Sequence, residues 1–195
     1  MRPHPTSLSD DIAALQQSLG RTSGPAVLVG HAYAGAVIAG RNDERVRSLV
    51  YVAALAPAEG ETVADVFYRA RPHPEAPKLQ PDLHGLIWMP EGGFAHAVAH
   101  NASPDQTTIL EAVQRPIAVK CIQEKAPVPA WRRTKPSWFL LAEEDRMIAP
   151  ETQRYMAERM GAKIRTHRVD HSPMHTAPDV VVDVILEAAR ETLAS

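Results

Sequence analysis

AVLVGHAYAGAV, residues 26–37, joins an apolar run to a run of small residues through a short turn. Ala26 to Val29 has the length of a buried strand, and Ala34 to Ala39 is small and apolar enough for a buried helix. The intervening residues have the spacing of a nucleophile elbow, in which a Gly-x-Ser-x-Gly turn connects a strand to a helix. The stretch therefore predicts a strand, a tight turn and a helix.

The centre of this turn is alanine where the motif has serine. In Gly30-His31-Ala32-Tyr33-Ala34, Ala32 takes the nucleophile position and Ala34 takes the place of the closing glycine. A methyl group cannot attack a carbonyl carbon. The backbone N–H of Tyr33 can still donate a hydrogen bond to an oxyanion, so Tyr33 and His31 are candidate oxyanion or pocket residues.

Outward from the elbow, apolar runs of strand length alternate with helical patterns. Ser9 is expected to start the first helix, which Gly20 ends. Alternation of near-continuous apolar strands with helices predicts an α/β fold with a mostly parallel sheet and helices on both faces. The further expected elements are strands at 49–52, 138–142 and 164–169, and helices at 34–39, 105–113, 150–160 and 178–193.

The middle of the chain is less regular. Residues 71–82 carry four prolines, and Pro90 to Gly93 is typical of a turn. We expect a single domain over residues 1–195, with residues 60–129 as a cap or insertion. The aromatic and sulfur side chains there and just beyond are candidates for either a pocket wall or the core: Trp88, Met89, Phe94 and Trp131.

Composition excludes several classes of function. A net charge of -2, with Lys and Arg scattered along the chain, gives no footprint for nucleic acid. Cys121 is the single cysteine, and we expect it to be a buried apolar residue. His96 and His100 are spaced i, i+4, but no further ligand completes a metal site, so neither metal nor cofactor is expected. The chain shows no signal peptide and no membrane span, which predicts a cytoplasmic protein.

Several segments together resemble one known family. Residues 27–37 resemble the elbow of α/β-hydrolases close to plant methylesterases, hydroxynitrile lyases and bacterial esterase-like proteins. Residues 129–131 and 136–150 resemble that family's late strand and acid loop, and residues 153–157 continue the match. Residues 170–174 and 178–179 resemble its histidine loop and last helix. The resemblance covers most of residues 6–193.

The resemblance implies a catalytic acid at Asp145 and a catalytic base at His171. The chain order of Ala32, Asp145 and His171 is that of nucleophile, acid and histidine in this family. Glu143 and Glu144 compete with Asp145 as the acid, and His171 has the alternative of being an ordinary loop histidine. A carboxylate bonded to one imidazole nitrogen leaves the other nitrogen free to accept a proton.

The family's opening segment has no counterpart in this sequence. Relatives begin with roughly four strands before the first helix, and one of them supplies a second N–H to the oxyanion hole. We therefore expect a sheet that lacks its first strands. The strand at residues 26–29 would then present a bare apolar edge, which predicts that a second copy or another polypeptide covers it.

Three hypotheses follow for the function. The first is an ancestral carboxylic-ester hydrolase that is inactive or impaired, a pseudoenzyme that can hold a small ester-like ligand. The second is a non-hydrolytic enzyme that uses the pair His171 and Asp145 as a base. The third is a non-catalytic binding or assembly protein.

Overall fold

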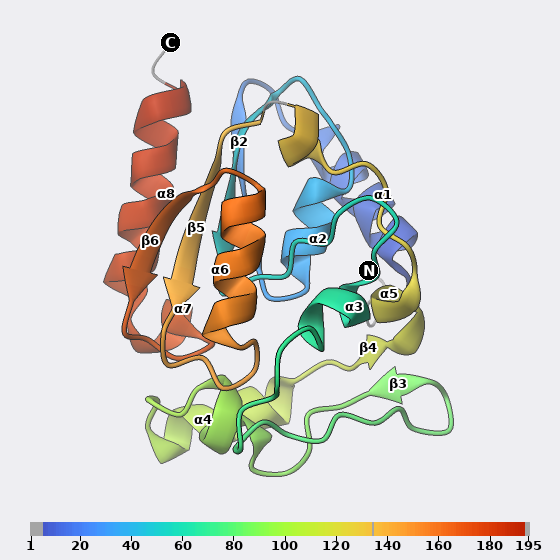
Figure 1. Cartoon of the computed structure of the whole chain (residues 1–195), viewed down its shortest axis with the longest axis vertical. Coiled ribbons are helices and arrows are strands. Elements are labelled where there is room, and N and C mark those ends of the chain that lie inside the picture. The colour runs from blue at the N-terminus through green and yellow to red at the C-terminus, as the bar shows by residue number, and fades with distance from the viewer. Residues whose placement is uncertain (1–5, 134, 194–195) are drawn as a thin grey trace.

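The computed structural model describes residues 6–133 and 135–193, and it shows a parallel sheet between two layers of helices (Figure 1). The sheet has the order β1-β2-β5-β6, and every neighbouring pair of strands is parallel. The α/β class with a mostly parallel sheet is thus confirmed. The strands are β1 Ala26–His31, β2 Val46–Val52, β5 Ser137–Ala142 and β6 Lys163–His167.

The central strands bury side chains on both faces. On β2, Leu49 and Tyr51 point into one apolar core, and Val50 and Val52 point into another. Successive side chains of a strand point to opposite faces, so a strand covered on both sides needs a continuous apolar sequence. This explains why β2 and β5 have no polar alternation.

Helices cover both faces of this sheet. One core contains α1 Leu8–Leu19, α2 Ala34–Ala39 and α6 Pro150–Arg159. The other contains α8 Pro178–Leu193, which buries Val181, Val184 and Ala188 on one side, as expected for helical spacing. In the part of the chain that the structure describes, no helix is both long and apolar enough to cross a bilayer.

Most predicted elements are present, with shifted ends. The first helix begins at Leu8, and its cap is Ser7 instead of the expected Ser9: the Ser7 hydroxyl accepts a hydrogen bond from the Asp10 amide at 3.0 Å. Strand β2 starts at Val46 because it pairs with β1 from that point. The short helix α7, Pro173–Thr176, was not expected.

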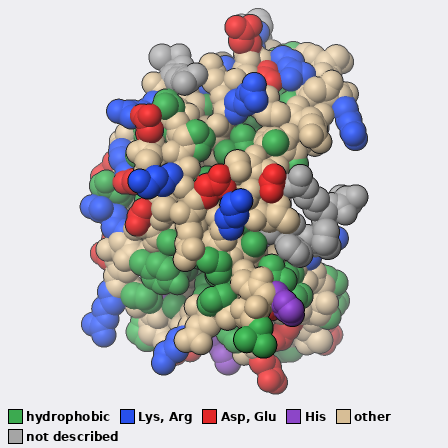
Figure 2. Space-filling view, turned by 90° about the vertical axis from the view of Figure 1, so that its right-hand side faces the viewer, with side chains coloured by type: hydrophobic (Ala, Val, Ile, Leu, Met, Phe, Trp, Pro, Cys, Tyr) green, Lys and Arg blue, Asp and Glu red, His purple; other side chains and the backbone are tan. Residues whose placement is uncertain are grey.

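Most of residues 60–129, including β3, β4 and α4, lie at the end of the sheet toward which the strand arrowheads point (Figure 1). Figure 2 shows hydrophobic side chains gathered on the lower part of the molecule, where this segment lies. The assignment of this segment as a cap stays a prediction. Its elements are α3 Val63–Phe67, the antiparallel pair β3 Leu86–Ile87 and β4 Ile117–Ala118, a π-helical turn Phe94–Val98, α4 Pro104–Val113 and α5 Val119–Gln123.

The two edge strands differ in chemistry. The outer strand β6 carries Lys163 and Arg165, whose side chains form ion pairs with residues of α8. Strand β1 is apolar, and its Val29 is 42% exposed. Among the described residues, no strand pairs with the free side of β1. Charged side chains protect an edge against unwanted pairing, and β1 lacks them.

Candidate active site

The turn after β1 has the backbone conformation of an elbow. Ala32 has a φ of 50°, in the left-handed region that a non-glycine residue enters at a cost of about 1–2 kcal/mol. Its carbonyl accepts hydrogen bonds from the amides of Leu55, at 2.9 Å, and Gly35, at 3.2 Å. Helix α2 begins two residues later, at Ala34. The predicted strand, tight turn and helix are confirmed.

Two glycines allow this turn to form. A Cβ atom on Gly30 would lie 2.7 Å from the Ala34 carbonyl oxygen, and a Cβ on Gly35 would lie 2.5 Å from the Leu55 carbonyl oxygen. Both distances are shorter than side-chain atoms tolerate. The elbow therefore needs glycine at these positions for close backbone approach.

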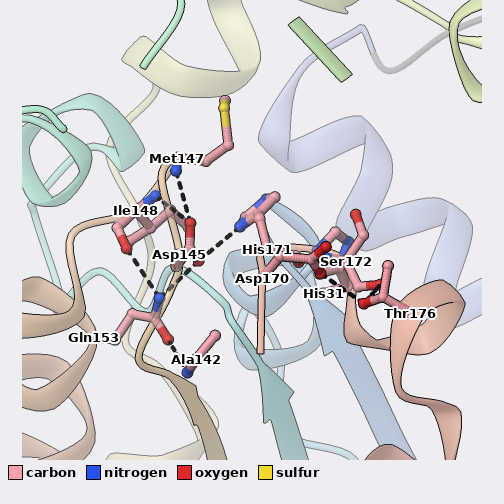
Figure 3. A network of polar contacts seen from close by, with 10 residues as sticks. All are labelled: His31, Ala142, Asp145, Met147, Ile148, Gln153, Asp170, His171, Ser172 and Thr176. Atoms are coloured by element: carbon pink, nitrogen blue, oxygen red, sulfur yellow. Dashed lines mark hydrogen bonds and ion pairs between the residues drawn. The ribbon is translucent and has the colours of Figure 1, made fainter. Parts of the chain in front are cut away.

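Asp145 is buried after β5, and its carboxylate accepts four hydrogen bonds (Figure 3). Oδ1 accepts from the amides of Met147, at 2.7 Å, and Ile148, at 2.9 Å. Oδ2 accepts from Gln153 Nε2, at 2.7 Å, and lies 2.8 Å from His171 Nδ1. A carboxylate surrounded by donors in this way is held in one orientation.

The imidazole of His171 is fixed by the same contact. An ionised carboxylate only accepts, so Nδ1 carries the hydrogen and the lone pair is on Nε2. Of the three acidic residues that competed for this role, Asp145 is the one that reaches His171. Glu143 is exposed, and Glu144 pairs with Arg168 at 3.3 Å.

The main chain that carries His171 is anchored by its neighbour Asp170, which is fully buried. Asp170 Oδ1 accepts from the Ser172 amide at 3.1 Å and from the Thr176 hydroxyl at 2.7 Å. Its Oδ2 accepts from the Asn101 amide at 3.0 Å, which ties the loop to the segment 60–129. Figure 3 shows Asp170 beside His171, directed toward α7 and away from Asp145.

His31, the last residue of β1, contacts the histidine loop. Its Nε2 lies 2.7 Å from the His171 carbonyl oxygen, and the two ring centroids are 4.7 Å apart. Burial, and then repulsion from His171, lowers the pKa of His31 to about 3. His31 is therefore a neutral imidazole at physiological pH, and because a carbonyl only accepts, its Nε2 carries the hydrogen.

Ala32 and His171 both line an apolar cavity of about 210 Å³. None of its lining residues carries a fixed charge. Apolar pockets with a few convergent polar groups are typical ligand sites. The lining residues are Ala32, Tyr33, Leu55, Val63, Ala64, Phe67, Tyr68, Leu79, Ile87, Met89, Ile117, Ile122, Met147, Ile148 and His171.

Tyr33 contributes to the cavity without its hydroxyl being free. The hydroxyl donates a hydrogen bond to Asp11 Oδ2 on α1 at 2.8 Å. Burial and this hydrogen bond raise the pKa of Tyr33. Cys121 contacts the same carboxylate oxygen, with Sγ 3.8 Å from Asp11 Oδ2. The predicted burial of Cys121 is confirmed, and burial raises the pKa of its thiol to about 11.

The structure brings some expected residues together and separates others. Ala32, Asp145 and His171 form one cluster, whereas His31 lies against the main chain of the histidine loop and is not among the residues that line the cavity. Of the aromatic and sulfur candidates, Met89 lines the cavity and Trp131 packs in the core. Within residues 6–133 and 135–193, no group of three or more His, Cys, Asp or Glu side chains could hold a metal ion.

Gln153 and Asp170 were not expected to support the site. Gln153 lies on α6, where its carbonyl oxygen accepts from the Ala142 amide at 3.1 Å while its amide group donates to Asp145. Both residues are fully buried polar groups. The signal available for Gln153 was a polar residue at helical spacing from Met156 and Ala157. The signal for Asp170 was an acid adjacent to the histidine.

Known proteins share this fold. The profile of the alpha/beta hydrolase family matches residues 2–184. Polyneuridine aldehyde esterase superposes with a TM-score of 0.81 at 16% identity, over 94% of this chain and 80% of that one. A methylesterase from Arabidopsis gives 0.74 at 16% identity, over 94% and 78%.

A third solved structure is a variant of methylketone synthase I from tomato, in complex with beta-ketoheptanoate. It superposes with a TM-score of 0.79 at 17% identity, over 95% of this chain and 79% of that one. At these identities the likeness shows the fold alone. No curated protein sequence matches the chain significantly.

Proposed function

Because the chain belongs to the alpha/beta hydrolase family but has a methyl group at the nucleophile position, we propose that its site catalyses proton transfer and not acyl transfer. The observation that carries this proposal is the 2.8 Å contact between Asp145 and His171 beside Ala32. Removing the nucleophile from a serine hydrolase costs on the order of 10⁶ in rate. A His–Asp pair needs no nucleophile to act as a general base.

The proposed reaction begins with a substrate that has an acidic C–H beside a carbonyl group. His171 Nε2 accepts the proton, and the electrons of the C–H bond move to the carbonyl oxygen, which forms an enolate. The Asp145 carboxylate stabilises the imidazolium, and the backbone N–H of Tyr33 donates a hydrogen bond to the enolate oxygen. Return of the proton to carbon completes an isomerisation or exchange.

The substrate that fits the cavity is uncharged and mostly apolar. No Lys, Arg, Asp or Glu lines it, so a charged group would enter without a partner. A ketone or an ester with a short alkyl or aryl group matches this lining. The similar methylketone synthase variant is in complex with beta-ketoheptanoate, which shares the C–H beside a carbonyl but carries a carboxylate, so the likeness extends to the acidic C–H and not to the charge.

Hydrogen exchange tests the proposal directly. Phenylacetone, an uncharged ketone, is incubated with the protein in D₂O, and loss of the benzylic proton signal is followed by NMR. We expect exchange above the buffer rate, abolished in His171→Ala and retained in Glu143→Gln, which removes an exposed acid. Equal exchange with the unmodified protein and His171→Ala would overturn the proposal.

Comparison of the unmodified protein with Ala32→Ser in an ester-hydrolysis assay distinguishes proton transfer from acyl transfer. Serine introduces a hydroxyl on the cavity wall that His171 also lines. With p-nitrophenyl acetate, we expect no acyl-enzyme burst from the unmodified protein. Hydrolysis by the unmodified protein that disappears in His171→Ala would instead support the ancestral esterase activity.

A binding or assembly role is the second candidate, and the free apolar side of β1 favours it. The proposed partner is a second copy of the chain or another polypeptide that pairs with β1. We expect a concentration-dependent mass in sedimentation, reduced in Val29→Lys, because a charge on an edge strand opposes pairing. A monomer at all concentrations would contradict self-association.

A further inference from the structure

His31, the residue before Ala32, contacts His171, the proposed base. His31 and His171 are 140 positions apart, yet the His31 ring lies against the His171 ring, with an angle of 48° between their planes. The hydrogen bond from His31 Nε2 ends on the main-chain carbonyl of His171. It therefore holds the backbone from which the base extends, while Asp145 holds the side chain.

The histidine loop is also held by Asp170, whose carboxylate accepts hydrogen bonds from other residues of the loop and of α7. Asp170 binds the amide of Ser172 and the hydroxyl of Thr176. None of the described groups other than His31 Nε2 bonds the His171 carbonyl from a side chain. Without it, the carbonyl of a buried residue would lose its donor, and the loop would be free to relax toward the position of His31.

We propose that His31 is a positioning residue for His171, since its Nε2–H holds the main chain of the base and its ring lies against the imidazole of the base. The inference rests on the proposed role of His171 in proton transfer. In this role, the turn around Ala32 is needed to place His31, and placing His31 does not require a nucleophile at position 32. The strained turn at Ala32 places the end of β1, and β1 places His31 under the histidine loop.

The neutral state of the His31 imidazole is part of its role in positioning His171. When His171 accepts a proton, a positive charge forms next to the His31 ring, at the 4.7 Å separation of the centroids. A cationic neighbour would oppose that step, whereas a neutral donor does not. His175 is the other titratable group near His31, and its exposed side chain lies on α7.

The test compares two substitutions at one site. His31→Gln keeps an N–H donor of similar reach, and His31→Leu removes it. Long-range ¹H–¹⁵N NMR of the His171 imidazole gives its tautomer and its titration midpoint without any substrate. We expect His31→Leu to shift the midpoint by at least about half a pH unit and to mix the tautomers, and we expect His31→Gln to restore the unmodified behaviour.

Exposed His175→Gln is the matched control, and it should leave both readings unchanged. Urea unfolding establishes that each variant is folded before its spectra are compared. In the phenylacetone assay, His31→Leu should lower kcat about tenfold or more with little change in KM, because misplacement of a base affects the chemical step. A His31→Leu variant that folds and keeps the His171 titration would overturn the inference, even if phenylacetone exchange is observed.

Discussion

Asp145 Oδ2 and His171 Nδ1 lie 2.8 Å apart, although 26 positions separate the two residues in the chain. Both side chains are almost completely buried, and the other three hydrogen bonds of Asp145 fix the direction in which it accepts. In the proposed reaction, this contact leaves His171 Nε2 as the atom that accepts the proton.

Asp145→Asn should change the tautomer of His171. An amide can donate to Nδ1, which moves the imidazole hydrogen to Nε2 and removes the base. We expect proton exchange to fall on the order of 10⁴-fold, as in a serine protease with the same change. NMR of the imidazole nitrogens measures the tautomer. An unchanged tautomer in the folded variant would contradict the assigned role of Asp145.

His31 should make the protein less stable in acid. Its pKa is about 3 in the folded chain against 6.5 in a model environment, so the unfolded chain binds the extra proton between these values. Stability contributed by neutral His31 is therefore full above pH 6.5 and is lost as pH falls toward 3. The slope from this group is up to about 1.4 kcal/mol per pH unit.

Urea unfolding at pH 7, 6 and 5 checks this dependence. His31→Gln should reduce the slope, because glutamine does not titrate. His171 and His175 face the same region, and they remain in both proteins, so the difference between the two isolates His31. Identical slopes would show that the pKa of His31 is not lowered in the folded chain.

Gly35→Ala should strongly destabilise the elbow. The added Cβ would lie 2.5 Å from the Leu55 carbonyl and 2.9 Å from the Ala54 Cβ, and we expect a loss of about 2–3 kcal/mol in the free energy of unfolding. Gly24→Ala is the control, since its φ of 86° is strained but its Cβ meets no atom within 4 Å. A smaller loss at Gly35 than at Gly24 would mean that crowding is unimportant.

Ligand charge should decide binding to the cavity. An uncharged ketone at about 100 times its Kd should stabilise the folded chain by about 2.7 kcal/mol and raise the Tm, whereas the carboxylic acid of the same carbon skeleton should not. Ala64→Trp places a bulky ring on the cavity wall and should remove the effect. A larger Tm shift with the acid than with the ketone would contradict an uncharged substrate.

The local sequence determined where most elements lie. Residues 26–39 specify their strand, turn and helix because apolar runs, small residues and glycines act within a few positions of each other. The end of a strand is less local. Strand β2 extends back to Val46 because it pairs with β1, and a pairing partner cannot be found from the strand's own residues.

The candidate site followed from sequence only through the family resemblance. Chain order pointed to Ala32, Asp145 and His171, but the choice of Asp145 over Glu143 and Glu144 depended on the register of the acid loop. In the tertiary structure, Asp145 is the one of these three acids that lies within hydrogen-bond distance of His171, and only folding brings the two residues together.

By itself, the sequence determined that position 32 has no nucleophile, since a methyl group cannot attack whatever surrounds it. Only the tertiary structure decided that His31 supports the histidine loop and does not line the cavity, and that Asp170 and Gln153 orient the site. These roles depend on contacts between residues distant in the chain. Such contacts arise from the packing of strands and helices, which the local sequence does not encode.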